Sequence, residues 1–177
     1  MNARELGVQR QAVHGGDPGT SLVFAATPDL PHRIGAAGEL AFAERYHLSV
    51  DRQARLGGDG GTDFVTPIGK VEVKTRTFKR RFAEEYFWVE AWQIPRLAPW
   101  VVFARYEPQA ETARLVGWTT NTVMRLRPMR RVRDGLGPYH WITEQLLCPM
   151  NHLACGGLVD YAPDAYCCAI HTPRGNA

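Results

Sequence analysis

The chain has 177 residues, of which 45% are hydrophobic and 22% are charged, and its formal net charge is +3. This length fits one domain, and the composition is that of an ordinary globular protein. No apolar run approaches the ~20 residues that a membrane-spanning helix needs, and the N-terminus lacks the basic-then-apolar order of a secretory signal. We therefore expect a cytoplasmic protein that has no contact with a membrane.

The N-terminal third is predicted to contain an irregular arm followed by one helix. Residues 1–31 are rich in Gly, Pro, Asp and Ser, which predicts an irregular arm. Residues 34–47 have apolar residues at helical spacing and good helix formers in their second half. Asp29 and Pro31 suit the start of this helix, since Asp caps well and Pro is tolerated in a first turn.

A region rich in β-structure follows, and the last part of the chain differs in composition. Strands are predicted at residues 49–56, 62–66, 70–75, 86–90, 100–106 and 115–119. The second and third of these form a hairpin, the run 100–106 is apolar enough to be central, and a short capped helix spans 121–126. The order predicts a mixed α/β domain at residues 32–145 with a curved central sheet flanked by helices. Residues 146–177 form a separate tail.

A short alternating segment at residues 70–75 carries the most informative chemistry. Because successive side chains of a strand point to opposite faces, Val71 and Val73 share one face. Glu72 and Lys74 share the other. The simplest packing buries the valines on the predicted helix and leaves the charged pair lining a cleft. A solvent-facing ion pair is the alternative, and a lone Glu-x-Lys motif is common in ordinary chains.

Asp63 adds a second carboxylate, because the predicted hairpin brings it beside the strand that carries Glu72. Neighbouring strands place such side chains about 5 Å apart, close enough for both to hold one hard cation. Mg²⁺ suits this pair because it takes oxygen ligands and keeps several waters, and Mn²⁺ can substitute for it. Asp59 is a rival, but Asp63 is preferred because it begins a strand-like apolar run. The glycines of residues 57–61 would let the backbone approach a metal or phosphate closely.

Asp63, followed after eight residues by Glu72-Val73-Lys74, resembles the motif of the PD-(D/E)XK nuclease superfamily. The resemblance covers about half the chain and departs from the pattern at Thr62, where proline would stand. It implies a restriction-endonuclease-like core. It also implies that Asp63 and Glu72 ligate the metal. Val73 would contribute its backbone carbonyl, and Lys74 would handle the nucleophile.

The upstream helix contributes a further acidic residue to the resemblance. Gly35 precedes Glu39 by four positions, as in the first helix of archaeal-type Holliday-junction resolvases and related phage nucleases. The family pattern implies that Glu39 binds a metal-held water. Glu44 is a rival, and the two cannot face one site because five helical residues turn through about 140°. The glycine spacing favours Glu39.

The resemblance thus implies a Mg²⁺-dependent DNA endonuclease that serves phage or host DNA processing and recombination, in the host cytoplasm if it is phage-encoded. Branched DNA such as a Holliday junction is the favoured substrate. A resolvase of this kind should be a homodimer, because two symmetric cuts need two sites. Two alternatives stay open: a catalytically silent nucleic-acid-binding protein of the same fold, and an RNA or tRNA endonuclease.

Two basic segments, at residues 74–81 and 125–133, flank a nearly neutral stretch that is rich in aromatic residues. Such segments suit contact with a phosphate backbone, since each neutralised phosphate releases counterions. A solvated basic surface is an equally acceptable interpretation of either segment alone. The residues that we expect to contact nucleic acid are Thr75, Arg76, Lys79, Arg80, Arg81, Arg130 and Arg131.

The tail contains all four cysteines of the chain and two histidines. These residues supply enough ligands for a tetrahedral structural Zn²⁺, but their spacing is not that of a standard zinc finger or ribbon. Reduced cysteines that pack in the core and disulfides are the alternatives. The residues concerned are Cys148, His152, Cys155, Cys167, Cys168 and His171.

Overall fold

The structure is a computed structural model that describes residues 2–14, 29–50, 61–77, 86–130 and 137–153. Its central sheet has the strand order β1-β2-β4-β5. The strands are β1 (Phe64–Thr66), β2 (Gly69–Thr77), β4 (Trp100–Glu107) and β5 (Thr112–Thr120). β2 and β4 are parallel, whereas β1 and β5 pair antiparallel with their neighbours. The sheet is therefore mixed, and the apolar strand β4 lies inside it, as predicted.

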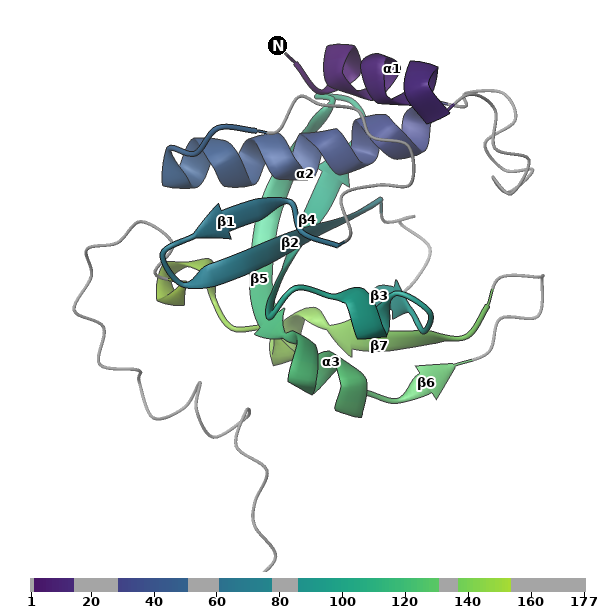
Figure 1. The fold of residues 1–177 in the computed structure, drawn as a ribbon, viewed down its shortest axis with the longest axis vertical. Coiled ribbons are helices and arrows are strands. Elements are labelled where there is room, and N and C mark those ends of the chain that lie inside the picture. Colours follow the sequence, from purple (N-terminus) through teal and green to yellow (C-terminus); the bar gives the residue numbers. More distant parts are fainter. Residues whose placement is uncertain (1, 15–28, 51–60, 78–85, 131–136, 154–177) are drawn as a thin grey trace, which may run out of the picture.

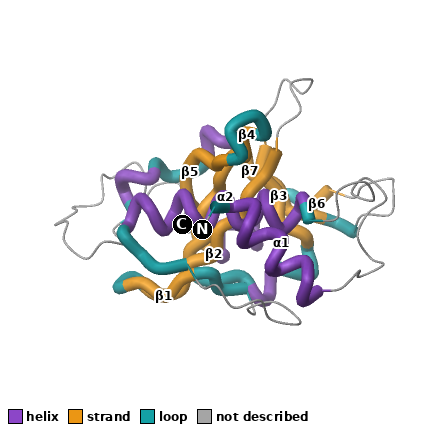
Figure 2. Tube along the Cα trace, turned by 90° about the horizontal axis from the view of Figure 1, so that it is seen from above, coloured by secondary structure: helices purple, strands orange, loops and turns teal. Residues whose placement is uncertain are grey.

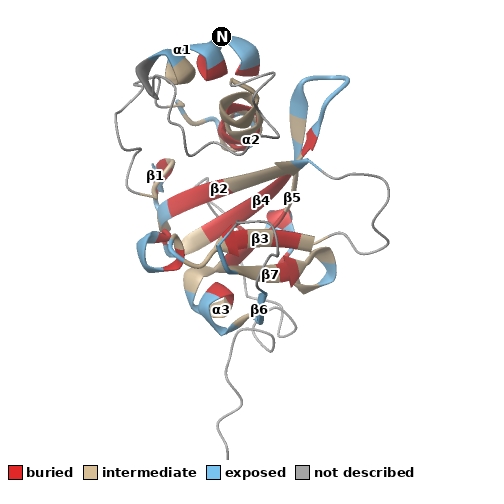
Figure 3. Cartoon of the chain, turned by 90° about the vertical axis from the view of Figure 1, so that its right-hand side faces the viewer, coloured by how far each residue is buried: buried red, intermediate tan, exposed pale blue. Residues whose placement is uncertain are grey.

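One face of this sheet is covered by helix α2 (Leu30–Tyr46), and helix α1 (Ala3–His14) packs on the outer side of α2 (Figures 1 and 2). A second sheet covers the other face (Figure 3). The second sheet has the order β3-β7-β6, with β3 (Tyr86–Glu90), β7 (Tyr139–Thr143) and β6 (Met129–Arg130). The described fold also contains helix α3 (Asn121–Leu126) and three 3-10 turns, at Ile94–Arg96, Glu144–Leu146 and Met150–His152.

Both faces of the central sheet are buried, because each packs on its own apolar cluster. Between the sheet and α2, Val71 and Val73 of β2 join Phe42 of the helix. Between the two sheets, the rings of Phe87 and Phe103 lie 5.0 Å apart in a second cluster. The buried parts of β2 and β4 therefore lie at the middle of the layers (Figure 3). This packing confirms the predicted α/β class, with a mixed sheet flanked by helices.

Several predicted elements agree with the structure. The strand at 86–90 and the helix at 121–126 have the predicted bounds. The Thr120 hydroxyl caps α3 by accepting a hydrogen bond from the Val123 N–H at 3.3 Å. Helix α2 begins at Leu30, with proline in its first turn, but the Asp29 side chain makes no capping hydrogen bond. Asp29 instead approaches Arg33 at 3.7 Å.

Other sequence predictions were wrong. Residues 3–14 form helix α1, not an irregular arm, and the rest of that arm to residue 28 lies outside the described residues. Ser49 and Val50 are not in a strand, and residues 51–56 are not described. The predicted single sheet is two sheets, because β3 pairs with β7 and not with the central strands.

The predicted boundary at residue 146 is also wrong for the first residues of the tail. Backbone hydrogen bonds of 2.9 and 2.8 Å join Trp118 of β5 to Cys148, which is buried in the core. Residues 146–153 therefore belong to the body of the domain. Among the described residues, no helix is long and apolar enough to cross a membrane.

Two glycines of α2 offer a matched test of this packing. A Cβ added to Gly38 would lie 1.9 Å from the Thr75 Oγ1 of β2, whereas one added to Gly35 would meet nothing within 4 Å. We expect Gly38→Ala to lower the free energy of unfolding by about 1–3 kcal/mol through overpacking. Gly35→Ala should raise it by about 0.4–1 kcal/mol, because alanine loses less backbone entropy in a helix. Urea denaturation measures both, and equal effects would contradict the close approach of α2 to β2.

Candidate functional site

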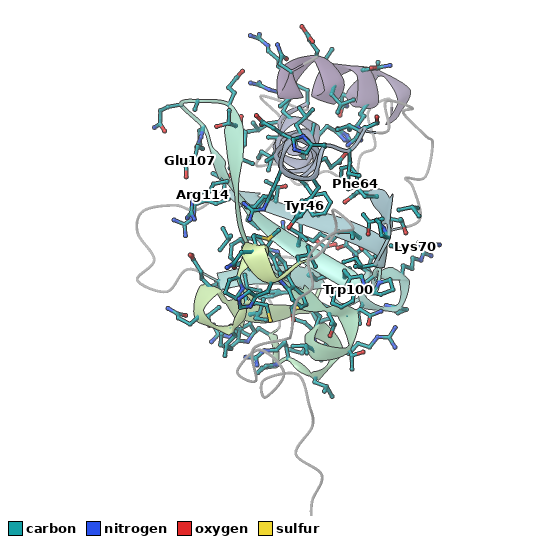
Figure 4. The ribbon with its side chains drawn as sticks, turned by 90° about the vertical axis from the view of Figure 1, so that its left-hand side faces the viewer. Tyr46, Phe64, Lys70, Trp100, Glu107 and Arg114 are labelled. Atoms are coloured by element: carbon teal, nitrogen blue, oxygen red, sulfur yellow. The ribbon has the colours of Figure 1, made fainter. Side chains whose placement is uncertain are left out.

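The predicted hairpin is present and is held at both ends. β1 and β2 pair antiparallel, with Phe64 opposite Val71. The turn is fixed by Trp100, whose indole N–H donates to the Ile68 carbonyl at 2.8 Å. Figure 4 shows Trp100 near this end of β2, where Lys70 projects outward from the molecule. The hairpin therefore brings the start of β1 alongside the middle of β2.

Glu72 and Lys74 share one face of β2, as the alternation of the strand predicted. The carboxylate of Glu72 is only 5% exposed and forms an ion pair with the Lys74 ammonium. Its second oxygen, Oε2, accepts a hydrogen bond from the Ala98 N–H at 3.4 Å. Lys74 is half-buried. A charged pair in such a place is stable only while both partners remain, because removing one would leave a buried charge unpaired.

Gly61 forms one wall beside this carboxylate. It has a φ of +83°, which favours glycine, and a Cβ there would lie 2.5 Å from the Arg96 carbonyl oxygen. The same Cβ would be 3.5 Å from Glu72 Oε2. Gly61 thus permits a close approach to the Arg96 backbone, its approach to a metal or phosphate stays a prediction, and residues 57–60 lie outside the described chain.

Asp63 lies against the backbone between the two charged residues of β2. Its Oδ2 accepts a hydrogen bond from the Val73 N–H at 2.6 Å, and its own N–H donates to the Val71 carbonyl at 3.0 Å. In a strand, the N–H and C=O of one residue point to the same edge. The Val73 carbonyl therefore points to the same side as Asp63. The rival Asp59 is not described.

Glu39 is buried, but its carboxylate contacts a different group. Arg10 of α1 binds it with two hydrogen bonds, of 2.6 and 2.7 Å. The rival Glu44 is exposed on α2, so Glu39 is the more enclosed of the two. Within the described ranges, no group of three or more His, Cys, Asp or Glu side chains could hold a metal ion. The structure thus pairs Glu72 with Lys74, places Asp63 on the backbone between them, and shows Glu39 in an ion pair with α1.

The residues that follow Lys74 point to opposite faces. Thr75 faces α2, where its buried hydroxyl lies next to Gly38, and its contact with phosphate stays a prediction. Arg76 lies on the face of Glu72 and Lys74. Its guanidinium is 4.0 Å from the centre of the Trp88 ring and donates to the Trp88 carbonyl at 3.0 Å. Burial lowers the pKa of Arg76 to about 10, with Glu90 opposing the shift, so the group remains charged at neutral pH.

The other predicted nucleic-acid contacts divide between described and undescribed residues. Arg130 is exposed on β6, with its guanidinium 4.5 Å from the centre of the Trp141 ring. Residues Lys79, Arg80, Arg81 and Arg131 lie outside the described chain. Sequence patterns did not single out the ring that each arginine contacts, because the contact depends on how the strands pack.

The predicted zinc ligands are only partly described. Cys148 is buried and disulfide-bonded, which favours the disulfide alternative for this cysteine. His152 is half-buried in the last 3-10 turn. Residues Cys155, Cys167, Cys168 and His171 lie outside the described chain.

Comparisons with known proteins add no relative: no protein-family model, no curated protein and no solved structure matches this chain. The site is therefore interpreted from its own geometry and chemistry.

The ion pair between α1 and α2 can be tested by a double-mutant cycle. Arg10→Met leaves the buried Glu39 without its partner and should lower the free energy of unfolding by about 2–3 kcal/mol. Adding Glu39→Gln should recover part of this loss, with a coupling energy of about 1–3 kcal/mol. Arg4→Met, at an exposed position of the same helix, is the control and should cost less than ~0.5 kcal/mol. Additive effects in urea denaturation would contradict the pair.

Proposed function

We propose that this protein is a Mg²⁺-dependent nuclease that hydrolyses phosphodiester bonds of DNA at Asp63, Glu72 and Lys74. One observation carries the proposal. The carboxylate of Asp63 binds the backbone of the residue that separates Glu72 from Lys74, so two acids and a base converge on three consecutive positions of one strand.

The donor set suits a hard divalent cation. Mg²⁺ in proteins is bound through one or two carboxylates, with waters and substrate phosphates completing the shell. Asp63 and Glu72 supply the two carboxylates, and the Val73 carbonyl points to the same side as Asp63. Bound there, the ion would supply the Lewis acidity that activates a water and offsets the charge that develops on the phosphate.

The chain's own groups then have distinct roles. Lys74 holds a positive charge beside Glu72, where it can orient the attacking water or stabilise negative charge on the scissile phosphate. Gly61 lets its backbone pack against the Arg96 carbonyl beside Glu72, where no side chain would fit. In this proposal the fold is restriction-endonuclease-like and of the PD-(D/E)XK type. Glu39 would bind a metal-held water only after leaving Arg10.

The favoured substrate is branched DNA, and a homodimer would supply the two symmetric sites that a junction needs. A catalytically silent binding protein and an RNA endonuclease are the competing functions. The buried Glu72–Lys74 pair supports the catalytic function over the silent one, because a surface that only binds phosphate gains nothing from a buried acid.

A cleavage assay tests the proposal. Purified protein is incubated with plasmid, linear duplex, single-stranded and four-way-junction DNA, with an RNA control, in Mg²⁺ or EDTA. We expect cleavage in Mg²⁺ that EDTA abolishes, and symmetric nicks in the junction. Asp63→Asn, Glu72→Gln and Lys74→Met should each lower the rate at least about 100-fold, which is the usual scale for removing one such group.

Lys70→Met is the matched control, because Lys70 lies on the same strand but is exposed and points away from the body (Figure 4). Its rate should stay within about threefold of the parent, since it has no role in the proposed site. Cleavage that survives EDTA or Asp63→Asn would refute the metal site. DNA binding without cleavage in any divalent ion would establish the catalytically silent binding protein. Cleavage of RNA alone would establish the RNA endonuclease.

A further inference from the structure

The second sheet presents an aromatic face on the side away from its buried cluster. Phe87 and Val89 of β3 and Ile142 of β7 point into that cluster. Because side chains alternate, the residues between them point the other way. This aromatic face consists of Tyr86 and Trp88 from β3 with Tyr139 and Trp141 from β7.

The four rings form a regular group with gaps between them. Tyr86 lies 6.0 Å from Trp88 and 6.1 Å from Trp141, and Trp88 lies 6.1 Å from Tyr139, measured between ring centres. All three pairs are tilted or edge-to-face, so no ring is stacked flat on another in these pairs. All four residues are half-buried. They therefore offer partly accessible ring faces whose spacing is set by the strand pairing of β3 and β7.

Arginines lie against the same rings. Arg76 lies over Trp88, and Arg130 lies 4.5 Å from the centre of Trp141 and 6.0 Å from that of Tyr86. The run from residue 121 to 130, which leads along α3 to β6, contains three arginines and no acidic residue. Among the described residues, Glu90 is the acidic side chain that β3 contributes to this face, and its carboxylate accepts a hydrogen bond from the indole N–H of Trp92. The face is thus aromatic and carries positive charge.

Two hydrogen-bond donors of this face have no partner among the described residues. The indole N–H of Trp141 and the Nε–H of Arg76 are buried, and neither has a hydrogen-bond partner in the described part of the chain. Buried donors are nearly always satisfied in folded proteins, so two at one face indicate a place where an acceptor-bearing ligand belongs. Phosphate oxygens and base carbonyls are such acceptors.

We propose that this aromatic face binds single-stranded nucleic acid and leads it to the nuclease site. Aromatic rings interleaved with arginines bind unpaired bases by stacking and the backbone by charge. Paired bases are stacked inside a duplex and cannot lie on these rings, so the ligand must contain a single-stranded stretch. The face is continuous with the site, since Arg76 and Lys74 lie on one face of β2, about 7 Å apart along the strand. The substrate class would therefore be DNA with an unpaired strand, which rests on the function proposed above.

Binding can be measured without cleavage, which separates this inference from the nuclease proposal. The probe is a fluorescein-labelled oligothymidylate of about twelve nucleotides, within the usual site size, followed by anisotropy in EDTA. An abasic oligomer of equal length carries the same phosphates but no bases. We expect the oligothymidylate to bind at least about tenfold more tightly than the abasic oligomer, because stacking is lost. An oligouridylate and a blunt duplex distinguish RNA and paired DNA.

Variants assign the binding to this face. Trp141→Ala should weaken oligothymidylate binding about 5- to 100-fold, while Trp141→Phe should retain most of it because a ring remains. Arg130→Ala, at an exposed position, should fold normally. It should lower the slope of log affinity against log salt concentration by about one, which corresponds to one lost phosphate contact. Arg4→Ala, exposed on α1 across the molecule, is the charge-matched control and should bind like the parent.

Three outcomes would overturn the inference: equal affinity for the oligothymidylate and the abasic oligomer, unchanged binding by Trp141→Ala and Arg130→Ala, or tighter binding of blunt duplex. Each could occur while cleavage in Mg²⁺ persists, which would leave the nuclease proposal intact. Conversely, binding to the aromatic face with no cleavage of any substrate would support the single-stranded binding face and refute both the nuclease and the path to its site.

Discussion

Strand β2 packs against a helix with one face and against a second sheet with the other, and the arrangement of its side chains organises the rest of the molecule. Val71 and Val73 form the contact with α2, which approaches so closely that only glycine fits at residue 38. The opposite face holds Glu72, Lys74 and Arg76 in a row. A shift of one residue in register would exchange these faces, placing two buried charges under the helix and two valines in the site. The hairpin to β1 and the parallel pairing with β4 prevent that shift.

Local sequence patterns predicted the helices and strands whose conformation is determined by a few adjacent residues. The helix at 121–126 has a threonine cap next to it, and the hairpin has a short turn between two apolar runs, so both were predicted from a few adjacent residues. The alternation of β2 predicted that Glu72 and Lys74 share a face. The same alternation turns Thr75 toward α2, away from the face that carries Glu72 and Lys74.

Sequence patterns could not predict the contacts between segments that lie far apart along the chain. β3 and β7 are separated by some fifty residues, and nothing in either strand indicates that Trp88 lies opposite Trp141. The aromatic face was visible in the sequence only as a stretch rich in Trp and Tyr. Helix α1 was missed because the glycine and proline content of residues 15–31 dominated the interpretation of the whole arm. The pairing of Arg10 with Glu39 depends on how α1 crosses α2, which no single helix encodes.

The free-energy cost of burying the Glu72–Lys74 pair helps to distinguish a structural role from a catalytic one. Glu72 is only 5% exposed, so its carboxylate has lost most of its hydration, and the attraction to Lys74 has to offset that loss. Apolar residues at such positions are often neutral or stabilising by about 1–4 kcal/mol, and valines already occupy the two alternate positions of the same strand. A purely structural role would favour apolar residues at 72 and 74 also. The acid and the base are thus more easily explained by chemistry at the site than by stability, which is why the cleavage rates of Glu72→Gln and Lys74→Met carry more weight than the stabilities of these variants.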